Sequence, residues 1–379
     1  KNEIHDVNTF GIQDESNMVL IGFVGFLDPP KTSAKKAINA LKRYGVDTVV
    51  LTGDSEGVAV KVCQKVGIHT KNSISGKDID EFTDEELKEK IKECHLFSKL
   101  SPLQKQRIVR LYQENGNTVG YMGDGINDSP PLKQADVGIS VDTAVDIAKE
   151  TADIILLEKD LNVLEEGVVN GRKTFTNVLK YIKMATSGNF GNMLSIIIAS
   201  LFLPFLPLLP IHILIQNLLN DFAQIGMPFD NVDDDYLKLP KRWDINSLKN
   251  FMLFMGPLSS CFDILIFTLM WFLFNIRDYA TFQTIWFSYG VVSNLIGMHI
   301  IRTAKTPFIQ SNASTGVYVS SIMLIVIAIL FPYTALGHFI GLVSVPLKYI
   351  YIIIGIPILY CYVATFAKKF YIKKHNEWI

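Results

Sequence analysis

Cysteine is scarce in this chain of 379 residues, and the four that occur lack the CxxC or histidine-rich spacing of a zinc site or a disulfide framework. We therefore expect reduced, structural thiols at Cys63, Cys94, Cys261 and Cys361. An excess of either charge is also missing, because 36 Lys and Arg residues nearly balance 37 Asp and Glu residues. Nothing in this balance indicates nucleic acid as a partner. The first residues contain neither the apolar run nor the cleavage site of a signal peptide, and we expect the chain to be a piece of a longer protein.

The apolar residues are distributed unevenly along the chain. They make up 49% of the sequence, and the mean hydropathy of +0.25 is high for a wholly soluble protein. Long apolar runs begin only near residue 187, whereas the earlier residues are charge-rich and mixed. We therefore predict a soluble domain with a linker helix over residues 1–185 and a transmembrane domain over residues 186–379.

The soluble part has the pattern of repeated βα units. A buried strand over 18–28 precedes a helix over 33–44, which Gly45 ends. The later predicted strands are 47–52, 94–99, 117–122, 137–141 and 153–157, and the later predicted helices are 56–66, 102–114 and 143–150. Residues 71–93 are polar and acidic, and we interpret them as a solvated insertion that holds one helix. Repeated βα units predict an α/β fold with a doubly wound parallel sheet.

Two tight turns follow predicted strands of this sheet. Thr52-Gly53-Asp54 ends one strand and Gly123-Asp124-Gly125-Ile126-Asn127-Asp128 ends another, while Lys105 lies between them in the sequence. Ligands collect at the carboxyl ends of parallel strands, so we expect the two turns to share one crevice. Taken singly, each could be an ordinary turn, because Gly and Asp are common in turns.

The residue types of these turns suit phosphoryl transfer, which needs positive charge and hydrogen-bond donors around the phosphate. Thr52 and the Gly53 amide could donate to phosphate oxygens, and Lys105 could supply charge. Asp124 could hold Mg²⁺, and Asn127 could orient the phosphate or an attacking water. The glycines at 123 and 125 permit close approach of the backbone.

These segments resemble the haloacid-dehalogenase-like fold, and more closely the phosphorylation domain of P-type ATPases. The motifs that carry the resemblance are Asp28-Pro29-Pro30-Lys31, Leu51-Thr52-Gly53-Asp54, Ser101-Pro102-Leu103-Gln104-Lys105, Met122 to Pro130, and Ala135 to Ser140. The resemblance implies ATP as phosphate donor, an aspartyl-phosphate intermediate and catalytic Mg²⁺. It also implies that Asp124 and Asp128 bind Mg²⁺ beside Gly125, that Lys105 contacts the phosphoryl group, and that Thr52, Gly53 and Asp54 act in the phosphate site.

The sequence also departs from the family pattern. The Asp-Lys-Thr-Gly-Thr phosphorylation loop does not occur in these residues, and most of the nucleotide-binding domain and the actuator domain are missing. We therefore expect the remaining N-terminal portion of a pump to be a partner of this chain. We also expect no phosphoenzyme when the chain alone is incubated with labelled ATP.

Six apolar stretches are long enough to cross a bilayer, which needs roughly 20 residues each. They lie at about 187–207, 211–228, 252–274, 282–301, 315–335 and 347–367. Lys and Arg residues are concentrated before the first, between the second and third, after the fourth and after the sixth. The positive-inside rule then predicts a multi-pass protein of the cell membrane whose soluble domain and C-terminus are cytoplasmic.

Polar residues inside these stretches mark a candidate ion path, because they are unfavourable in lipid. The second stretch is the most polar, and its polar residues recur at helical spacing so that they share one face. The candidate ligands of a transported ion are Asn189 and Asn192 in the first stretch, Asn217, Asn220 and Asp221 in the second, and Asp263 in the third. Oxygen ligands suit Mg²⁺ or Ca²⁺ rather than zinc or copper. The alternative interpretation is hydrogen bonding between helices.

The second stretch and its surroundings are similar to magnesium-importing P-type ATPases. The similar segments are Gln216 to Asp221, Pro228 to Asp233, Arg242-Trp243-Asp244, Gly256 to Ser260 with Asp263, and Ile301 to Gln310. This resemblance implies ATP-driven transport of Mg²⁺. The alternatives are a calcium-type pump, a membrane-tethered phosphatase of the same fold, and a non-catalytic relic.

Overall fold

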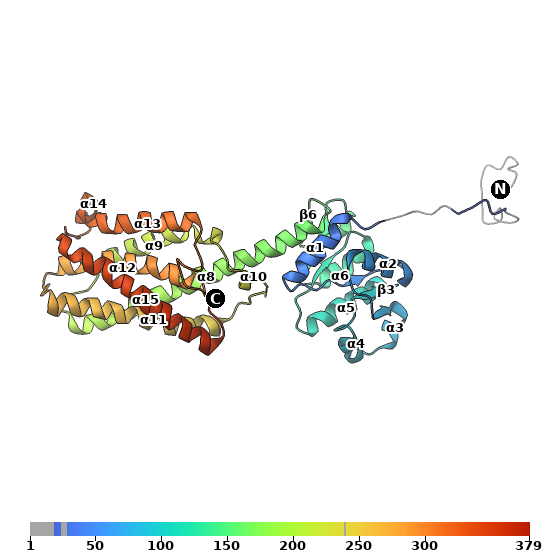
Figure 1. The fold of residues 1–379 in the computed structure, drawn as a ribbon, viewed down its shortest axis with the longest axis horizontal. Helices are drawn as coiled ribbons and strands as arrows, with labels where there is room; N and C mark the ends of the chain where they lie inside the picture. The colour runs from blue at the N-terminus through green and yellow to red at the C-terminus, as the bar shows by residue number, and fades with distance from the viewer. Residues whose placement is uncertain (1–18, 24–28, 239) are drawn as a thin grey trace. The chain divides into compact units, whose positions relative to one another are not determined.

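The computed structural model describes residues 19–23, 29–238 and 240–379. The chain divides into two compact units, the first made of residues up to Leu41 with Asp47–Val163 and the second of Lys42–Val46 with Leu164–Ile379. Figure 1 labels many of the helices and some of the strands. The predicted domain boundary at 185/186 falls inside the long helix α8 (Leu161–Phe202), which begins at the end of the first unit.

Two three-stranded parallel sheets form the centre of the first unit. One contains β1 (Val50–Leu51), β3 (Leu96–Ser98) and β2 (Ser73–Ser75) in that order, and the other contains β4 (Gly120–Met122), β5 (Val137–Val141) and β6 (Ile154–Leu156). The parallel pairing agrees with the sequence prediction, although the described strands form two sheets rather than one. Among the described residues, β1 and β4 each pair with one strand only, so no ladder joins the two sheets.

Helices surround these sheets. The hydrophobic spacing predicts α1 (Thr32–Arg43), α2 (Glu56–Val66), α5 (Pro102–Glu114) and α7 (Asp146–Thr151). The short helix α6 (Ser129–Gln134) was not predicted. Helix α5 begins where expected because Ser101 caps it and Pro102 occupies its first turn. Its apolar face buries Ile108, Val109 and Leu111.

Two predictions for the first unit need correction. The segment 71–93 holds β2, α3 (Gly76–Glu81) and α4 (Asp84–Lys90) rather than one helix, because Ser75 and Thr83 each form a capping box that starts a new helix. The strand predicted over 18–28 is not found in Val19–Phe23, which has no regular secondary structure and whose apolar side chains are exposed. The remainder of that strand lies outside the described residues.

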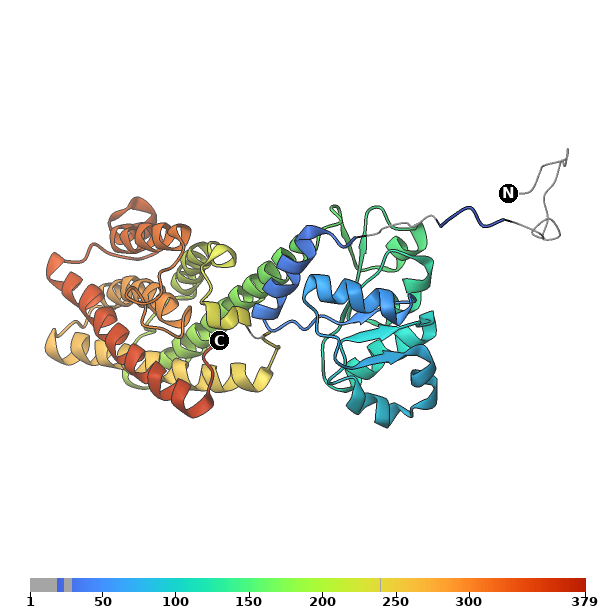
Figure 2. The same ribbon diagram turned by 45° about the vertical axis from the view of Figure 1, so that its right-hand side comes forward.

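The second unit is helical, and Figures 1 and 2 show its helices running side by side as a bundle. After α8 come α9 (Pro210–Gln224), α10 (Asp234–Lys238), α11 (Ile245–Thr268), α12 (Tyr279–Ile301), α13 (Thr315–Leu330), α14 (Ala335–Phe339) and α15 (Ile350–His375). A π-helical segment, Leu269–Leu273, extends α11. Helix α12 is the most deeply buried, with Phe282, Ile285 and Phe287 fully covered.

Four helices of the described chain are long and apolar enough to cross a membrane: Ile245–Leu273, Tyr279–Ile301, Thr315–Tyr333 and Leu347–His375. They match the last four predicted stretches. The stretch at 187–207 corresponds to the end of α8 and the one at 211–228 to α9, and neither is among these four. Helix α9 has only 15 residues, and several of them are polar.

Candidate functional site

The first candidate site lies where α5 meets the turn after β4. Lys105 Nζ lies 2.8 Å from Asp128 Oδ1, and both side chains are largely buried, with exposed fractions of 11% and 14%. The Tyr121 hydroxyl donates to the same oxygen at 2.8 Å, and the Gly125 amide donates to Oδ2 at 3.2 Å. Burial alone would raise the pKa of Asp128, but Lys105 and Tyr121 outweigh it and the pKa is lowered. Asp128 is therefore held as a carboxylate.

The loop after β1 is held by backbone hydrogen bonds to β3 and the residues just after it. Thr52 N donates to Phe97 O, and the Leu100 amide donates to Thr52 O. The Thr52 hydroxyl accepts from Asp54 N at 3.1 Å, while Asp54 O accepts from Lys99 N. These contacts keep Gly53 and Asp54 at the strand end, as the sequence predicts. The hydrogen bonds described for Thr52 do not include Lys105 or Asp124.

Asp124 has a different partner from Asp128. Its carboxylate lies 2.6 Å from Lys159 Nζ, and both side chains are about half exposed. Lys159 follows β6 and belongs to no motif, so it could not be singled out from the sequence. Asn127 is exposed on the short 3-10 turn between β4 and α6.

The carboxylates of this site could bind Mg²⁺, but they do not supply a full set of ligands for it. Among the described residues no three acidic, histidine or cysteine side chains cluster as a metal site. Mg²⁺ keeps several waters and commonly takes one or two carboxylates together with phosphate oxygens. Asp124 fits this pattern because an exposed lysine, which a cation could displace, is its ion-pair partner.

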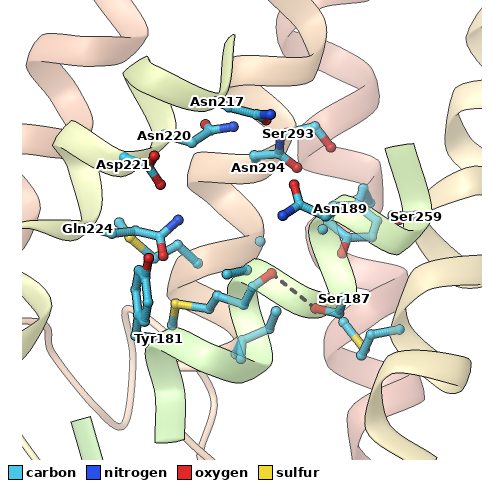
Figure 3. Close-up of a pocket in the computed structure, with 18 residues that line it drawn as sticks. Tyr181, Ser187, Asn189, Asn217, Asn220, Asp221, Gln224, Ser259, Ser293 and Asn294 are labelled. Carbon is cyan, nitrogen blue, oxygen red and sulfur yellow. Dashed lines mark hydrogen bonds between the residues drawn. The ribbon is translucent and has the colours of Figure 1, made fainter. Parts of the chain in front are cut away.

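The second candidate site is a cavity of about 280 Å³ within the helical unit. Its polar lining comes from α8, α9, α11, α12 and α15, and Figure 3 shows the labelled side chains facing a common space. Of the predicted ion ligands, Asn189, Asn217, Asn220 and Asp221 line it, together with Gln224. Ser259, Ser293 and Asn294 also line the cavity and were not predicted. Ser293 and Asn294 are polar residues within the apolar helix α12, and this signal could have identified them.

Two oxygens in this cavity lack partners. Asn220 Oδ1 and Gln224 Oε1 are buried, and neither has a hydrogen-bond donor. A buried acceptor without a donor costs roughly 1–3 kcal/mol, so such atoms call for a bound water or cation. Asp221 supplies a negative charge beside them and is exposed, as is Asn189.

Two predicted ligands lie outside the lining of this cavity. Asn192 is three residues beyond Asn189, which places it about 60° away around the helix axis. Asp263 is one turn beyond Ser259 and is hydrogen-bonded to Ser195 and Trp286 instead. Neither residue is therefore part of the cavity lining that contains Asp221.

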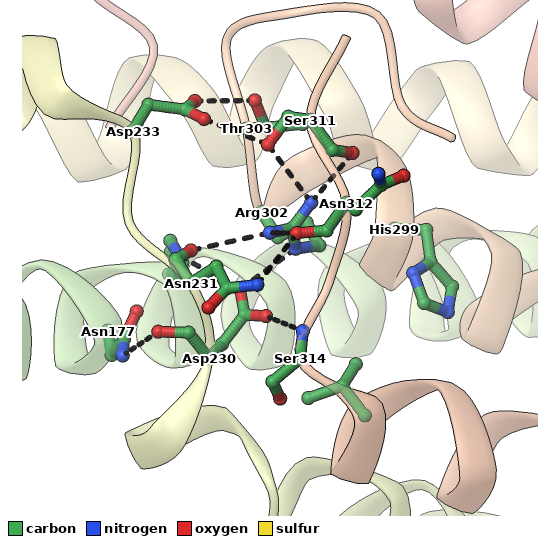
Figure 4. Close-up of polar contacts among 12 residues, drawn as sticks. Asn177, Asp230, Asn231, Asp233, His299, Arg302, Thr303, Ser311, Asn312 and Ser314 are labelled. Atoms are coloured by element: carbon green, nitrogen blue, oxygen red, sulfur yellow. Dashed lines mark hydrogen bonds and ion pairs between the residues drawn. The ribbon is translucent and has the colours of Figure 1, made fainter. Parts of the chain in front are cut away.

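A buried charge network lies beyond the end of α9 (Figure 4). Asp230 Oδ2 is 3.0 Å from Lys180 Nζ and 2.8 Å from Arg302 Nε, and the three side chains are at most 1% exposed. The Ser314 amide donates to the other Asp230 oxygen at 3.0 Å. Nearby, Asp233 accepts from the hydroxyls of Thr303 and Ser311. The network joins α8, the loop after α9 and the end of α12.

The chain matches two protein families. The C-terminus of cation transporting ATPases matches residues 205–370, and the haloacid dehalogenase-like hydrolases match residues 2–136. The chain is 48% identical over 373 residues to a protein named magnesium-transporting ATPase, P-type 1, of Salmonella typhimurium, a match that covers 98% of this chain. The protein of that name in Escherichia coli K12 is also 48% identical, over 96% of this chain. A calcium-transporting ATPase of Bacillus subtilis is 31% identical over 84% of it.

The length of the matches is as informative as their identity. The chain spans 41% of each magnesium-transporting relative and 37% of the calcium-transporting one. The two family matches follow one another along the chain, in the order of its α/β and helical units. The chain therefore belongs to the P-type ATPase family, and it matches the C-terminal part of its relatives.

Proposed function

We propose that this chain supplies the cation pocket and part of the phosphoryl-transfer site of an ATP-driven Mg²⁺ pump. The observation that carries the proposal is the group of oxygen donors around one cavity of the helical unit. Asn217, Asn220, Asp221 and Gln224 face it from α9, and two of their amide oxygens are buried without a donor. A cation would satisfy both oxygens and the carboxylate together.

The donor chemistry favours Mg²⁺ or Ca²⁺ over softer metals, because every polar group named in the lining offers oxygen and none offers thiolate or imidazole. One carboxylate among amides suits a cation that keeps part of its water shell, as Mg²⁺ does. The higher identity to the magnesium-transporting relatives than to the calcium-transporting one supports the same choice.

In the α/β unit, we assign positioning and charge to the residues at the strand ends. Lys105 would contact the phosphoryl group, and Asp128 would hold the lysine in place. The Thr52 hydroxyl and the Gly53 amide would donate to phosphate oxygens, with Asp54 beside them, while Asn127 would orient the phosphate or water. Asp124, with Asp128 and Gly125 beside it, would hold Mg²⁺, which neutralises phosphate charge when bound. ATP hydrolysis would be an activity of the whole protein.

We further propose a cytoplasmic α/β unit and a cytoplasmic C-terminus in the cell membrane, with residues 1–185 soluble and 186–379 in the bilayer. The positive-inside pattern supports this orientation. Three of its lysines have a structural role as well: Lys180 contacts Asp230, Lys183 donates to Trp378 O, and Lys368 donates to Lys305 O. Two shorter and more polar helices, the end of α8 and α9, would cross inside the bundle.

Transport by the intact protein in proteoliposomes tests the proposal. Asp221→Asn should weaken the apparent affinity for Mg²⁺ by at least about tenfold, because it removes the negative ligand. Asp235→Asn is the matched control, since Asp235 is an exposed acid outside the cavity. Unchanged Mg²⁺ affinity in Asp221→Asn would remove this cavity as the ion site, and equal stimulation by Ca²⁺ would favour the calcium-type alternative.

A binding measurement that does not depend on ATP sharpens the test. Asn220→Leu removes the unpaired acceptor at nearly constant volume, so the metal-free protein should melt at a higher temperature than the wild type. The same variant should lose the rise in melting temperature that Mg²⁺ causes. A variant that keeps the full Mg²⁺ response would show that Asn220 is not a ligand.

A further inference from the structure

Asp263 is a buried carboxyl group in the middle of α11 and is not part of the lining of the cation cavity. The residue is 6% exposed. Ser195 Oγ of α8 lies 2.5 Å from its Oδ2, and Trp286 Nε1 of α12 donates to its Oδ1 at 3.2 Å. The other titratable groups set against it are the phenols of Tyr289 on α12 and Tyr360 on α15, and Tyr360 also lines the cation cavity. Among the described residues no lysine, arginine or histidine pairs with it.

Asp230 in the same unit shows what a buried ionised carboxylate looks like here. It is equally covered, and it has both a lysine and an arginine within 3.0 Å. An ionised carboxylate at Asp263 would have two neutral donors and no cation, in a helix that is apolar enough to span a membrane. Burying such a charge without a counter-charge is strongly unfavourable, whereas the neutral acid avoids that cost.

The hydrogen bonds around Asp263 are compatible with a protonated, neutral carboxyl group. As a neutral acid, Asp263 donates from Oδ2 to Ser195 Oγ, and the Ser195 hydroxyl donates to Gly191 O, which lies 2.9 Å away. Trp286 then donates to the carbonyl oxygen of the acid. Hydrogen bonding alone would also allow the ionised form, because Ser260 can donate to Gly191 O in place of Ser195. The absence of a neighbouring cation among the described residues distinguishes the two protonation states, and it favours the neutral acid.

We propose that Asp263 is a proton-binding site of the helical bundle, distinct from the cation cavity, and that its bound proton links α11 to α8. The two helices also meet closely one turn before Ser195, since a Cβ added to Gly191 would lie 3.0 Å from Gly256 O. Ser259, one turn before Asp263, and Asn189 of α8 both line the cation cavity. Loss of the proton would place a charge against Ser195 and weaken the contact between the two helices that form one wall of that cavity.

Infrared difference spectroscopy of the purified intact protein in lipid nanodiscs tests the proposal, because a neutral carboxylic acid has a carbonyl stretch that a carboxylate lacks. The wild type at neutral pH should show such a band, shifted in heavy water. Asp263→Asn should remove it, because the amide can make the same hydrogen bonds but binds no proton. Asp221→Asn should keep it. An unaltered band in Asp263→Asn overturns the proposal.

Two further measurements cover the case in which Asp263→Asn does not fold. Ser195→Ala should move the band to higher frequency, because the acid loses its acceptor. Ser200→Ala should leave it in place, since Ser200 lies on the same helix and donates only to Ile196 O at an exposed position. No shift in Ser195→Ala overturns the proposal. Addition of Mg²⁺ to Asp221→Asn should also leave the band unchanged, and its loss would make Asp263 a metal ligand rather than a proton site.

Discussion

Each unit of this chain holds one aspartate between two cations, and the two arrangements differ chiefly in their exposure to water. In the α/β unit, Asp84 lies 2.7 Å from both Arg107 and Arg110, and its side chain is 33% exposed. In the helical unit, Asp230 lies 2.8 Å from Arg302 and 3.0 Å from Lys180, and its side chain is fully buried. Similar distances therefore occur in two very different dielectric surroundings.

This difference in exposure determines at which aspartate the negative charge is needed for stability. Water can solvate Arg107 and Arg110 if Asp84 is lost, because all three groups reach the surface. Water cannot reach Lys180 or Arg302, so the loss of Asp230 would leave two buried cations without a counter-charge. The effects of substitutions should follow burial rather than the number of ion pairs.

The largest expected effect is that of Asp230→Asn. Breaking a buried ion pair from one side costs about 3–5 kcal/mol, and we expect a decrease of this size in the free energy of unfolding of the helical unit. Unfolding of the purified protein in detergent measures it. Asp235→Asn, in the exposed pair with Lys238, is the control and should change stability by less than about 0.5 kcal/mol.

A second variant shows whether charge is the cause. Adding Lys180→Met to Asp230→Asn removes one of the orphaned cations, so the double variant should be more stable than Asp230→Asn alone. A double variant that is less stable would mean that packing, rather than charge, determines the effect.

The next effect concerns the backbone of the α/β unit. A Cβ at Gly123 would collide with Asp128 Cβ and lie 2.7 Å from its Cγ. Gly123→Ala should therefore displace the Asp128 carboxylate from Lys105 and decrease the unfolding free energy by about 1–3 kcal/mol. Gly120→Ala in β4, the strand just before this turn, is the matched control, because its Cβ would meet only ordinary contacts at 3.8 Å or more. Equal stability of the two variants would contradict the steric argument.

Structural features that depend on the local sequence pattern could be predicted. Helix α5 was predictable because Ser101 and Pro102 define its start, and the shared face of Asn217, Asn220 and Asp221 follows from helical spacing. These features need only neighbours within a few residues. The parallel pairing of strands also followed from the βα alternation.

Features that depend on distant contacts were not predictable. Asp230 finds its cations 50 and 72 residues away, and Lys159 meets Asp124 across 35 residues. The sequence gives no spacing rule for such pairs. The separation into two sheets likewise depends on which strands find partners, and Asp263 resembles an ion ligand until its neighbours Ser195 and Trp286 are known.

Lowering the pH should have a smaller effect, through protonation of Asp128. Because the pKa of Asp128 is lowered in the folded chain, its carboxylate stabilises the fold at pH values above its unfolded pKa of about 3.9. This contribution, on the order of 1 kcal/mol, should disappear as the pH falls through the lower, folded pKa. The stability gap between wild type and Asp128→Asn should therefore be open at pH 6 and close below about pH 4. Asp146→Asn, an exposed acid paired with Lys149, should show no gap at either pH.

The smallest effect should be that of Asp84→Asn, and it decides the comparison with Asp230. Its partners Arg107 and Arg110 keep other contacts, since Arg107 donates to the backbone oxygens of Ile79 and Phe82 and Arg110 contacts Glu114. Exposed ion pairs contribute about 0–1 kcal/mol, so the free energy of unfolding of the α/β unit should fall by less than about 1 kcal/mol. Raised salt should shrink this difference further, because screening acts on exposed pairs, while the effect of Asp230→Asn should be nearly independent of salt. A large, salt-insensitive loss in Asp84→Asn would show that burial does not separate the two aspartates.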